Sequence, residues 1–499
     1  MSPDAKLEKA VNDSLFKVNP AIKVRPKQLA AIKSILSGTD TLAILPTSYG
    51  KSMIFRLLPA VCKALDSHPN NAIVIVIAPL ISIVVDQVEA ANNLNSSLGL
   101  NACSICLTEY ENIRNLKYNI LVGTPEAWLD SERWEGVISS EVFRQRLVCI
   151  VVDEVHQVSW GYNDTLTGEA AFREAFSRIG TLRSFCCENV PVLALSATVT
   201  RDYCELISMS CSLSNNLKLI VTCSDRPNIR LSYVKCPEKN INCFSWVIKK
   251  LKELGNKCPK MMIYCRSQLL VGWLYEQFFI QLKLKMFKDG SKGTKNALLA
   301  MYHADTLDYI KNHIVEELTC DSSTLRVVIC TSALGCGVDC KNVKYIFHFG
   351  PPHNLIDYCQ QIGRAGRGNE SDCHAILYHF PGCLTKLVSA DMKLYMKTTS
   401  CLRTALFSPF NETEISQKHP LHQCCINCAK SCSCGSEECI NSFPFESLSN
   451  DSTTEESDSD VIPHKRVRTG GDAVEKSPQY EFEDSEDDLN DFNEDLEPE

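Results

Sequence analysis

The sequence predicts an α/β protein with two tandem parallel-sheet domains, a small helical module rich in cysteine and a disordered acidic tail. Short apolar runs rich in β-branched residues recur between residues 41 and 331, and most of them end in small or polar residues. Such runs are typical of strands buried on both faces of a parallel sheet. After residue 439 the composition changes to Ser, Asp and Glu with few apolar residues. A segment of this kind buries too little surface to offset the entropy of ordering.

Length and composition place the chain among globular proteins. Its 499 residues have room for two or three domains, and 44% hydrophobic with 22% charged residues are ordinary values for them. No apolar run approaches the ~20 residues of a membrane span, and residues 1–10 lack the apolar core of a signal peptide. We therefore expect an intracellular protein without a membrane partner. The 27 cysteines are odd in number and scattered, as expected of reduced, buried thiols.

The charge is divided unevenly along the chain. Residues 451–499 hold 18 Asp and Glu against 4 Lys and Arg, and the remainder holds 42 against 47. The net charge of −9 thus divides into −14 on the tail and +5 on the body. A mildly basic body is compatible with a polyanionic partner, and the acidic tail is a candidate surface for protein partners.

The first predicted strand, residues 41–45, leads into a candidate phosphate loop. The loop comprises Thr47, Ser48, Tyr49, Gly50, Lys51 and Ser52, and residues 53–65 read as a helix. A loop between a strand and a helix can cradle phosphates, because backbone N–H groups and the helix N-terminus face the anion. Lys51 would reach the outer phosphates, and the Ser52 hydroxyl would bind Mg²⁺. The strict P-loop pattern is not met, since Leu45 stands where its first Gly would be.

A second candidate feature follows the predicted strand at residues 148–152. Asp153 and Glu154 come directly after this apolar run. Ligands of open α/β sheets lie beyond the carboxyl ends of the strands. An Asp there can hold Mg²⁺ that bridges nucleotide phosphates, and a neighbouring Glu can orient or deprotonate water. The alternative is a strand that ends in a solvated acidic turn.

Other predicted strands also end in polar loops. Strands at residues 72–77 and 192–195 and one ending near residue 123 are followed by such loops, and Ser196 and Thr198 belong to one of them. Hydroxyls and N–H groups of these loops can contact a sugar-phosphate backbone, although ordinary connections look the same. Gln28 precedes an apolar-periodic helix, and its amide has the paired donor and acceptor that an adenine edge requires.

Residues 223–398 read as a second α/β unit. It has predicted strands near residues 261–265 and 327–331 and ends in a segment with the pattern Q-x-x-G-R-x-G-R, which contains Arg364 and Arg367. Two arginines three residues apart on one helical face can reach across a cleft to a γ-phosphate. A solvated basic turn is the alternative.

The order of these motifs resembles a known family. RPKQ, PTSYGKS, APLIS with DQ at 86–87, TPE, DEVH and SAT occur in this order between residues 25 and 198, and SDRPNIR follows at 224–230. With the double-arginine pattern, they resemble the RecQ branch of superfamily 2 DNA helicases over roughly residues 20–430. The resemblance implies RecA-like domains at 1–222 and 223–398, a zinc-binding module at 399–440 and a disordered acidic tail at 441–499.

The resemblance implies an ATP·Mg²⁺ site with assigned residues. The catalytic residues would be Lys51, Asp153, Glu154, Arg364 and Arg367. Further nucleotide contacts would come from Arg25, Gln28, Thr47, Ser48, Tyr49, Gly50, Ser52, Asp339 and Gln360. Ser48 stands where the family has Gly, which costs about 1–2 kcal/mol if that position needs a positive φ.

The resemblance also implies a route from the nucleotide to DNA. Its residues would be His156, Trp160, Phe172, Arg173, Ser196 and Thr198. Trp160, Phe172 and Arg173 are similar to parts of the family's aromatic-rich loop, and aromatics beside Arg can stack on single-stranded bases. This loop departs from the family by lacking the Gln before Trp160 and by a short insertion near residues 163–170.

The cysteines after residue 400 predict a zinc site. Cys425 and Cys428 have zinc-knuckle spacing. The family's module begins with one Cys in a C-R-R-like segment, which Cys401 matches, and ends in a C-x-x-C pair. We assign Zn²⁺ to Cys401, Cys425, Cys428 and Cys432, with Cys424 or His422 as alternatives to Cys432.

The resemblance implies an ATP-dependent helicase that moves 3′ to 5′ along single-stranded DNA, with roles in DNA repair and recombination. The basic segment at 464–468 is a candidate nuclear-import signal. No segment after residue 439 has the length and apolar content of the family's winged-helix domain, so we expect poor strand separation. The alternatives are a degenerate helicase that serves as a DNA-binding adaptor and an RNA helicase of the same superfamily.

Overall fold

The structure is a computed structural model. It describes residues 2–46, 49–65, 69, 71–108, 110–129, 132–161, 173–186, 190–222, 224–290, 293–334, 338, 340–367, 372–410, 415, 417–435 and 439, with the side chains at 132, 133, 159–161, 201, 202 and 289 left out. Met1–Asp451 forms one compact unit. The predicted acidic tail lies outside the described residues.

The first sheet has seven parallel strands in the order β3-β4-β2-β5-β6-β1-β7. In chain order the strands are β1 (Thr41–Ile44), β2 (Ile73–Ile77), β3 (Ala102–Ser104), β4 (Ile120–Gly123), β5 (Leu147–Val152), β6 (Val192–Ser196) and β7 (Lys218–Val221). The central strands are buried along their whole length, which explains their continuous apolar runs. Because all strands run the same way, the loops after β1, β5 and β6 meet at one edge.

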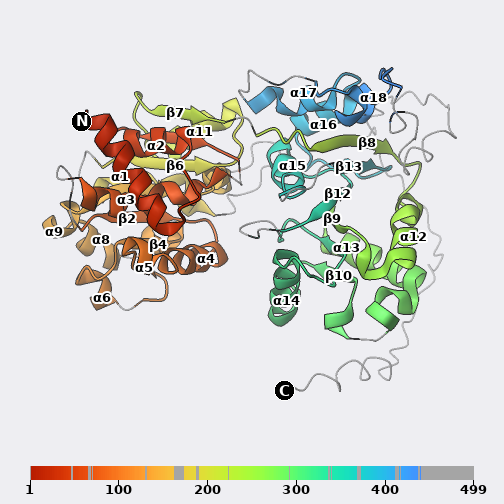
Figure 1. Ribbon diagram of the computed structural model, residues 1–499, viewed down its shortest axis with the longest axis horizontal. Helices are drawn as coiled ribbons and strands as arrows, with labels where there is room; N and C mark the ends of the chain where they lie inside the picture. Colours follow the sequence, from red (N-terminus) through yellow and green to blue (C-terminus); the bar gives the residue numbers. More distant parts are fainter. Residues whose placement is uncertain are drawn as a thin grey trace, which may run out of the picture. The chain divides into compact units, whose positions relative to one another are not determined.

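Helices cover both faces of this sheet (Figure 1). They are α1 (Pro3–Val18), α2 (Pro26–Leu36), α3 (Lys51–Ala64), α4 (Ile81–Asn92), α5 (Asn95–Leu98), α6 (Tyr110–Arg114), α7 (Pro125–Leu129), α8 (Glu132–Ile138), α9 (Glu141–Arg144), α10 (Thr181–Phe185) and α11 (Arg201–Ser210), with the 3₁₀ segments η2 (Val155–Gly161) and η3 (Glu174–Arg178). One hydrophobic core joins α1, α2 and α3 to the sheet, and a second core lies on the opposite face around Trp128, Trp134 and Phe143.

The second sheet has six parallel strands in the order β10-β11-β9-β12-β13-β8. They are β8 (Ile229–Lys235), β9 (Lys260–Cys265), β10 (Leu299–Tyr302), β11 (Val327–Cys330), β12 (Val343–Phe349) and β13 (Cys373–His379). The helices of this part are α12 (Ser245–Leu254), α13 (Gln268–Leu282), α14 (Asp308–Thr319), α15 (Leu355–Ile362) and α16 (Ala390–Lys397). Its 3₁₀ segments are η4 (Ile241–Phe244), η5 (Gly255–Lys257), η6 (Lys283–Met286), η7 (Lys288–Gly290) and η8 (Thr294–Asn296).

An aromatic cluster fills one face of the second sheet. The ring of Phe244 lies 5.2–5.6 Å, between centroids, from those of Phe278, Phe347, Phe349 and Tyr378. Edge-to-face and tilted ring pairs at these distances add to the stabilisation from buried area. The aromatic residues of η4, α13, β12 and β13 therefore form a single packed layer.

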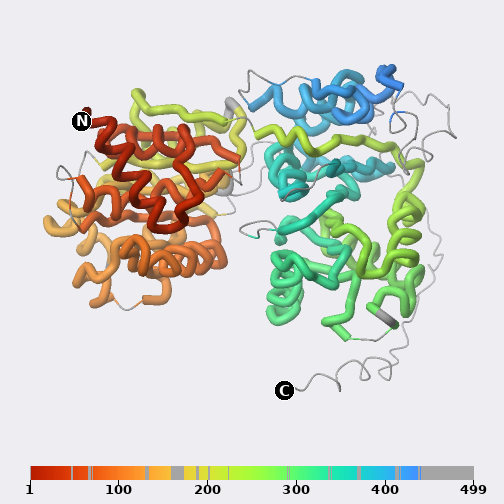
Figure 2. The backbone as a smooth tube through the Cα atoms, viewed as in Figure 1, coloured from red at the N-terminus to blue at the C-terminus, as the bar shows by residue number. Residues whose placement is uncertain are grey.

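The cysteine module packs on the other face of this sheet. It contains α17 (Leu402–Phe407), η9 (Ser408–Phe410), η10 (Leu421–Gln423) and α18 (Ile426–Ala429). Its chain, blue in Figure 2, runs beside β8, and Cys425 forms a β-bridge with Leu231. The module's cysteines and apolar residues belong to the same core as the interior of the sheet.

The predicted fold class is confirmed for the described residues, which form two parallel α/β sheets and a helical cysteine module. The domain boundaries at residues 222 and 398 stay a prediction. None of the helices in the described residues has the length and apolar content needed to cross a lipid bilayer.

Candidate active site

The phosphate loop ends at the start of α3. Gly50 is the N-cap residue and has a left-handed backbone with φ of 79°. A β-carbon at this position would lie 2.8 Å from Gln28 Nε2, so both conformation and space favour Gly. Lys51 is the first helical residue and is only 7% exposed. The predicted contacts Thr47 and Ser48 lie outside the described residues.

Gln28 holds this loop from α2. Its Nε2 donates to the carbonyl oxygens of Tyr49 and Gly50, both at 3.0 Å, and its Oε1 accepts from Arg25 N at 3.0 Å. The Arg25 guanidinium lies 4.8 Å from the centroid of the Tyr49 ring. Both amide protons of Gln28 are donated to carbonyl groups of the loop. A hydrogen bond from Gln28 to an adenine would therefore require these bonds to be replaced. The nucleotide-contact roles of Arg25, Gln28 and Tyr49 stay predictions.

Gln87 joins the two candidate Mg²⁺ ligands. Its Nε2 donates to Asp153 Oδ2 at 2.9 Å and to Ser52 Oγ at 3.2 Å, and its Oε1 accepts from Arg56 Nη2. Asp153 and Ser52 therefore lie within a few ångströms of one shared donor, although one follows β5 and the other begins α3. Carboxylate and hydroxyl oxygens are the donors that Mg²⁺ prefers, so the residues present fit this ion.

The pKa values of the two acidic residues after β5 are shifted in opposite directions. Burial and the neighbouring Glu154 raise the pKa of Asp153 to about 6, whereas Lys51 acts to lower it. Burial also acts to raise the pKa of Glu154, but the positive charges of Lys51, Arg364 and Arg367 act in the opposite direction and the pKa falls below its ordinary value. Glu154 is thus kept ionised, as a group that accepts a proton must be.

Glu154 has an unusual backbone and a poorly satisfied carboxylate. Its φ is 48°, a left-handed conformation that side chains with a β-carbon seldom adopt. Lys51 Nζ lies 3.9 Å from Oε1. The other oxygen, Oε2, is buried, accepts no hydrogen bond among the described residues and lies 3.6 Å from His156 Nδ1. A buried carboxylate oxygen with unused acceptor capacity suits a water molecule or a proton.

His156 links motifs from both sheets. Its Nδ1 is 3.0 Å from Ser196 Oγ, and its Nε2 is 2.8 Å from Gln360 Nε2. Ser196 Oγ donates to the Thr198 carbonyl at 2.9 Å, so it accepts from His156, which places the imidazole proton on Nδ1. Nε2 then accepts from the Gln360 amide. Burial lowers the pKa of His156 to about 4, which is consistent with this neutral tautomer.

The two predicted arginine fingers lie in the turn after α15. Nη1 of Arg364 donates to the Val338 carbonyl at 2.9 Å, and Nη1 of Arg367 donates to the same oxygen at 3.5 Å. This turn is not a helical face as predicted, since α15 ends at Ile362. Because both guanidinium groups donate to the Val338 carbonyl, they nevertheless lie on the same side of the turn. Asp339, the neighbour of Val338, lies outside the described residues.

Linker residues hold this turn in place. Arg226 donates to the carbonyls of Gly363, Ala365 and Gly366, and Asn228 Nδ2 donates to the Gly366 carbonyl at 3.1 Å. Gly366 has a φ of 59°, and a β-carbon there would lie 2.2 Å from Asn228 Nδ2. The linker at 224–230 therefore helps to hold the arginine turn, the turn after α15 that contains Arg364 and Arg367.

Arg173 is engaged inside the first sheet's loops. It makes a two-pronged ion pair with Glu126 after β4 and donates to the Pro79 carbonyl after β2. Its guanidinium also lies 4.8 Å from the centroid of Phe176. Arg173 thus connects two of the loops predicted to contact nucleic acid. Phe172 and the side chain of Trp160 lie outside the described residues.

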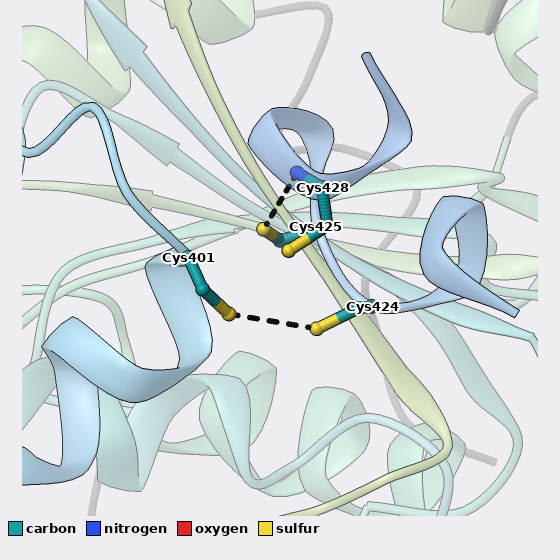
Figure 3. A group of neighbouring side chains, drawn as sticks. All are labelled: Cys401, Cys424, Cys425 and Cys428. Carbon is teal, nitrogen blue, oxygen red and sulfur yellow. Dashed lines mark hydrogen bonds between the residues drawn. The ribbon is translucent and has the colours of Figure 1, made fainter. Parts of the chain in front are cut away.

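Four cysteines of the module point toward one another (Figure 3). They are Cys401, Cys424, Cys425 and Cys428, all buried, and their sulfurs lie within 4.8 Å of one another. Cys401 Sγ and Cys424 Sγ are 3.6 Å apart, too far for a disulfide and close to the ~3.8 Å that zinc–sulfur bonds of 2.3 Å impose in a tetrahedron. The donor set fits Zn²⁺. The structure brings Cys424 to this group and places Cys432 elsewhere, which corrects our first choice of fourth ligand.

Sequence reasoning missed several supporting residues. Gln87 and Glu126 fell inside recognised motifs without an assigned role, and Arg226 and Asn228 were part of a linker. Gln87 lies on the buried face of α4 with Ile83, Val84 and Ala91, and a polar residue at that position of the apolar period is the signal that could have marked it. The partners of Arg226 lie well over a hundred residues away, and no local pattern indicates them.

The sequence of this chain is similar to those of known helicases. The DEAD/DEAH box helicase family matches residues 25–206, and the helicase conserved C-terminal domain matches residues 245–369. The chain is 28% identical to the ATP-dependent helicase SGS1 of Saccharomyces cerevisiae over 86% of this chain and 29% of that protein. It is 26% identical to the ATP-dependent DNA helicase RecQ of Pasteurella multocida over 84% of this chain and 62% of that protein. The chain thus covers well under two thirds of the length of several of its relatives.

Solved helicase structures share the fold. The DUF1998 helicase MrfA bound to DNA superposes with a TM-score of 0.58 at 18% identity, covering 82% of this chain and 54% of that one. Saccharomyces cerevisiae Dbp5 bound to RNA and ADP BeF3 gives 0.55 at 16% identity, covering 83% and 93%. The two sheets, the residues at their edges and these relatives lead to one conclusion. The chain belongs to the RecQ family of superfamily 2 ATP-dependent helicases.

Proposed function

We propose that this helicase hydrolyses ATP to move 3′ to 5′ along single-stranded DNA. The observation that best supports coupling between nucleotide and movement is the hydrogen-bonded series Gln360–His156–Ser196–Thr198. It begins in the arginine-bearing segment of the second sheet and ends in a loop of the first. A change at Glu154, which lies beside His156, would therefore alter hydrogen bonds made by elements of both sheets.

The site residues have complementary roles in the proposed hydrolysis. Lys51 and the N-terminus of α3 would neutralise the phosphates, and Ser52 and Asp153 would hold Mg²⁺, which lowers the cost of the charge on the leaving phosphate. Glu154 would take a proton from the attacking water. Arg364 and Arg367 would stabilise charge that develops on the γ-phosphate.

DNA is the proposed polymer on the strength of the relatives. SGS1 is described as an ATP-dependent helicase and the Pasteurella RecQ protein as a DNA helicase, and the fold neighbours were solved with either DNA or RNA. The loops that Arg173 connects, after β2 and β4, are the proposed contacts to the sugar-phosphate backbone. Nuclear location is proposed from the segment at 464–468, and imaging of a fluorescent fusion with and without that segment checks it.

The test is ATP hydrolysis by the purified chain with and without single-stranded DNA. We expect DNA to stimulate turnover several-fold, and Lys51→Ala or Glu154→Gln to reduce it at least about 100-fold. The first change removes a charge that neutralises the phosphates, and the second removes the group that would take the proton of the attacking water. Lys33→Ala is the matched control, because Lys33 is an exposed residue of α2 paired with Asp4. Turnover that equals that of the two variants, with DNA still bound, would overturn the proposal.

Direction is tested separately. Streptavidin displacement from oligonucleotides biotinylated at one end measures movement toward that end. We expect displacement from the 5′ end only. Displacement from the 3′ end would contradict the proposed polarity while leaving ATP hydrolysis intact, and an RNA oligonucleotide of the same sequence distinguishes the two polymers.

A further inference from the structure

A second group of metal-binding side chains lies in the cysteine module, separate from the group around Cys401. It consists of His422, Cys432, Cys434 and Cys439, whose ligand atoms all lie within 4.8 Å of one another. His422 is a buried residue of η10, and the three cysteines follow α18. None of these residues belongs to the first group, so the module offers eight ligands in two sets of four.

The distances in this group match a tetrahedral zinc site. Zn²⁺ binds sulfur at about 2.3 Å and imidazole nitrogen at about 2.0–2.1 Å, which places N and S ligands about 3.5 Å apart in a tetrahedron. His422 Nδ1 is 3.5 Å from Cys432 Sγ and 3.3 Å from Cys434 Sγ. No disulfide joins these three cysteines, since a disulfide would require sulfurs about 2.05 Å apart.

The local sequence explains why a metal would be needed here. Residues 430–435, KSCSCG, contain no large apolar side chain apart from the cysteines, and Gly435 turns the chain with a φ of 72°. Such a segment cannot order itself by burying hydrophobic surface. Thiolate and imidazole ligands would supply the missing stabilisation, because binding free energy in a structural zinc site is folding free energy.

We propose that the chain binds a second zinc ion through His422, Cys432, Cys434 and Cys439. Three soft thiolates and one imidazole select Zn²⁺ over the hard cations Mg²⁺ and Ca²⁺. Four protein ligands close the coordination sphere, so the site is structural and leaves no position for a reacting water. The ion ties Cys432, Cys434 and Cys439 to η10, next to Cys424 of the first group.

The test is the zinc content of the purified full-length chain by inductively coupled plasma mass spectrometry. We expect two zinc ions per chain in the parent protein and one in the double variant Cys432→Ser/Cys434→Ser. The double variant Cys106→Ser/Cys320→Ser is the matched control, since both are exposed and lie outside either group. One zinc in the parent protein, or two in the Cys432→Ser/Cys434→Ser variant, would overturn the proposal.

A second pair of variants separates metal binding from general damage to the fold. His422→Cys keeps a zinc ligand at this position, so we expect it to retain two ions, whereas His422→Ala should retain one with normal circular dichroism. Absorption of the Co²⁺-substituted protein reports the ligand set, and its spectrum should change toward an all-sulfur site in His422→Cys. Identical zinc content and spectra in both variants would show that His422 is not a ligand. None of these readouts depends on ATP hydrolysis.

Discussion

The two parallel sheets bury their faces by different means. The first sheet is covered on both sides by hydrophobic cores built from its own helices and strands. The second sheet has an aromatic layer on one side, but on the other side its core includes Cys401, Cys424, Cys425 and Cys428 of the module. Similar sheet topologies therefore rest on different chemistry.

A buried charge joins several elements of the first sheet. The Asp40 carboxylate, whose side chain is 1% exposed, accepts from Arg183 Nη1 at 2.8 Å and from the backbone N–H groups of Val192 and Ser214 at 2.9 and 2.7 Å. It joins the starts of β1 and β6 to the segment before β7. The first sheet is thus joined by hydrogen bonds to a buried carboxylate, whereas one face of the second is covered by a cluster of four cysteines.

Loss of zinc from the group around Cys401 should destabilise the second sheet much more than the first. This is the largest difference that we expect between the two sheets. Structural zinc contributes on the order of 10–16 kcal/mol in small modules. With Cys401→Ser/Cys425→Ser, we expect amide protons of β8 and β13 to exchange much faster, because the module no longer covers that face. Strands β1, β5 and β6 should keep their protection. Hydrogen exchange with mass spectrometry measures both, and equal loss in the two sheets would contradict the division.

Asp40→Asn should weaken the first sheet by about 3 kcal/mol, as expected when a buried ion pair loses one charge. Burial acts to raise the pKa of Asp40, but Arg183 and the two N–H donors outweigh it and hold the pKa below its ordinary value. The stabilisation is therefore present above about pH 4 and is lost as the pH falls further. Urea unfolding of both proteins at pH 7 and pH 3 should show the difference shrink, and a constant difference would contradict this assignment.

The smallest expected effect concerns the linker between the sheets. Arg403, buried in the module, donates to Asp225 and to the Arg226 carbonyl at 3.3 Å, and Arg226 supports the arginine turn. Arg226→Gln should lower kcat for ATP about tenfold, or ~1.4 kcal/mol, with little change in KM, because Arg226 positions the turn without contacting the substrate.

Arg114→Gln is the control for this variant, since Arg114 is exposed and pairs only with Glu111 within α6 in the described structure. A rise in KM with an unchanged kcat would show that Arg226 acts on nucleotide binding instead. Equal losses in both arginine variants would point to a general effect of charge.

The central strands, the residues that end them and the helix α3 could be predicted from the sequence. Apolar runs predicted the central strands, and Asp153 and Glu154 were correctly expected at the end of one of them. The helix predicted at residues 53–65 is confirmed as α3, which begins two residues earlier, directly after the left-handed N-cap Gly50. These features are local, so neighbouring residues determine them.

Other features depend on the folded chain. Arg364 and Arg367 do not share a helical face, because α15 stops at Ile362 and the following turn is fixed by Arg226 from far upstream. Spacing alone did not decide between Cys432, Cys424 and His422 as the fourth ligand, and only the folded chain, in which Cys425 bridges to β8, shows Cys424 beside Cys401. The ion pair of Arg173 with Glu126 is equally non-local.

The left-handed backbone of Glu154 has a consequence for how such sequences change over time. At a φ of 48°, a residue with a β-carbon costs roughly 1 kcal/mol relative to Gly. The proposed proton acceptor therefore occupies a position where Gly or Asn fits the backbone better. A library of variants enriched only for heat resistance would accumulate those residues at 154 and lose hydrolysis early. If Glu persists at this position in a lineage, selection has favoured ATP turnover over thermal stability.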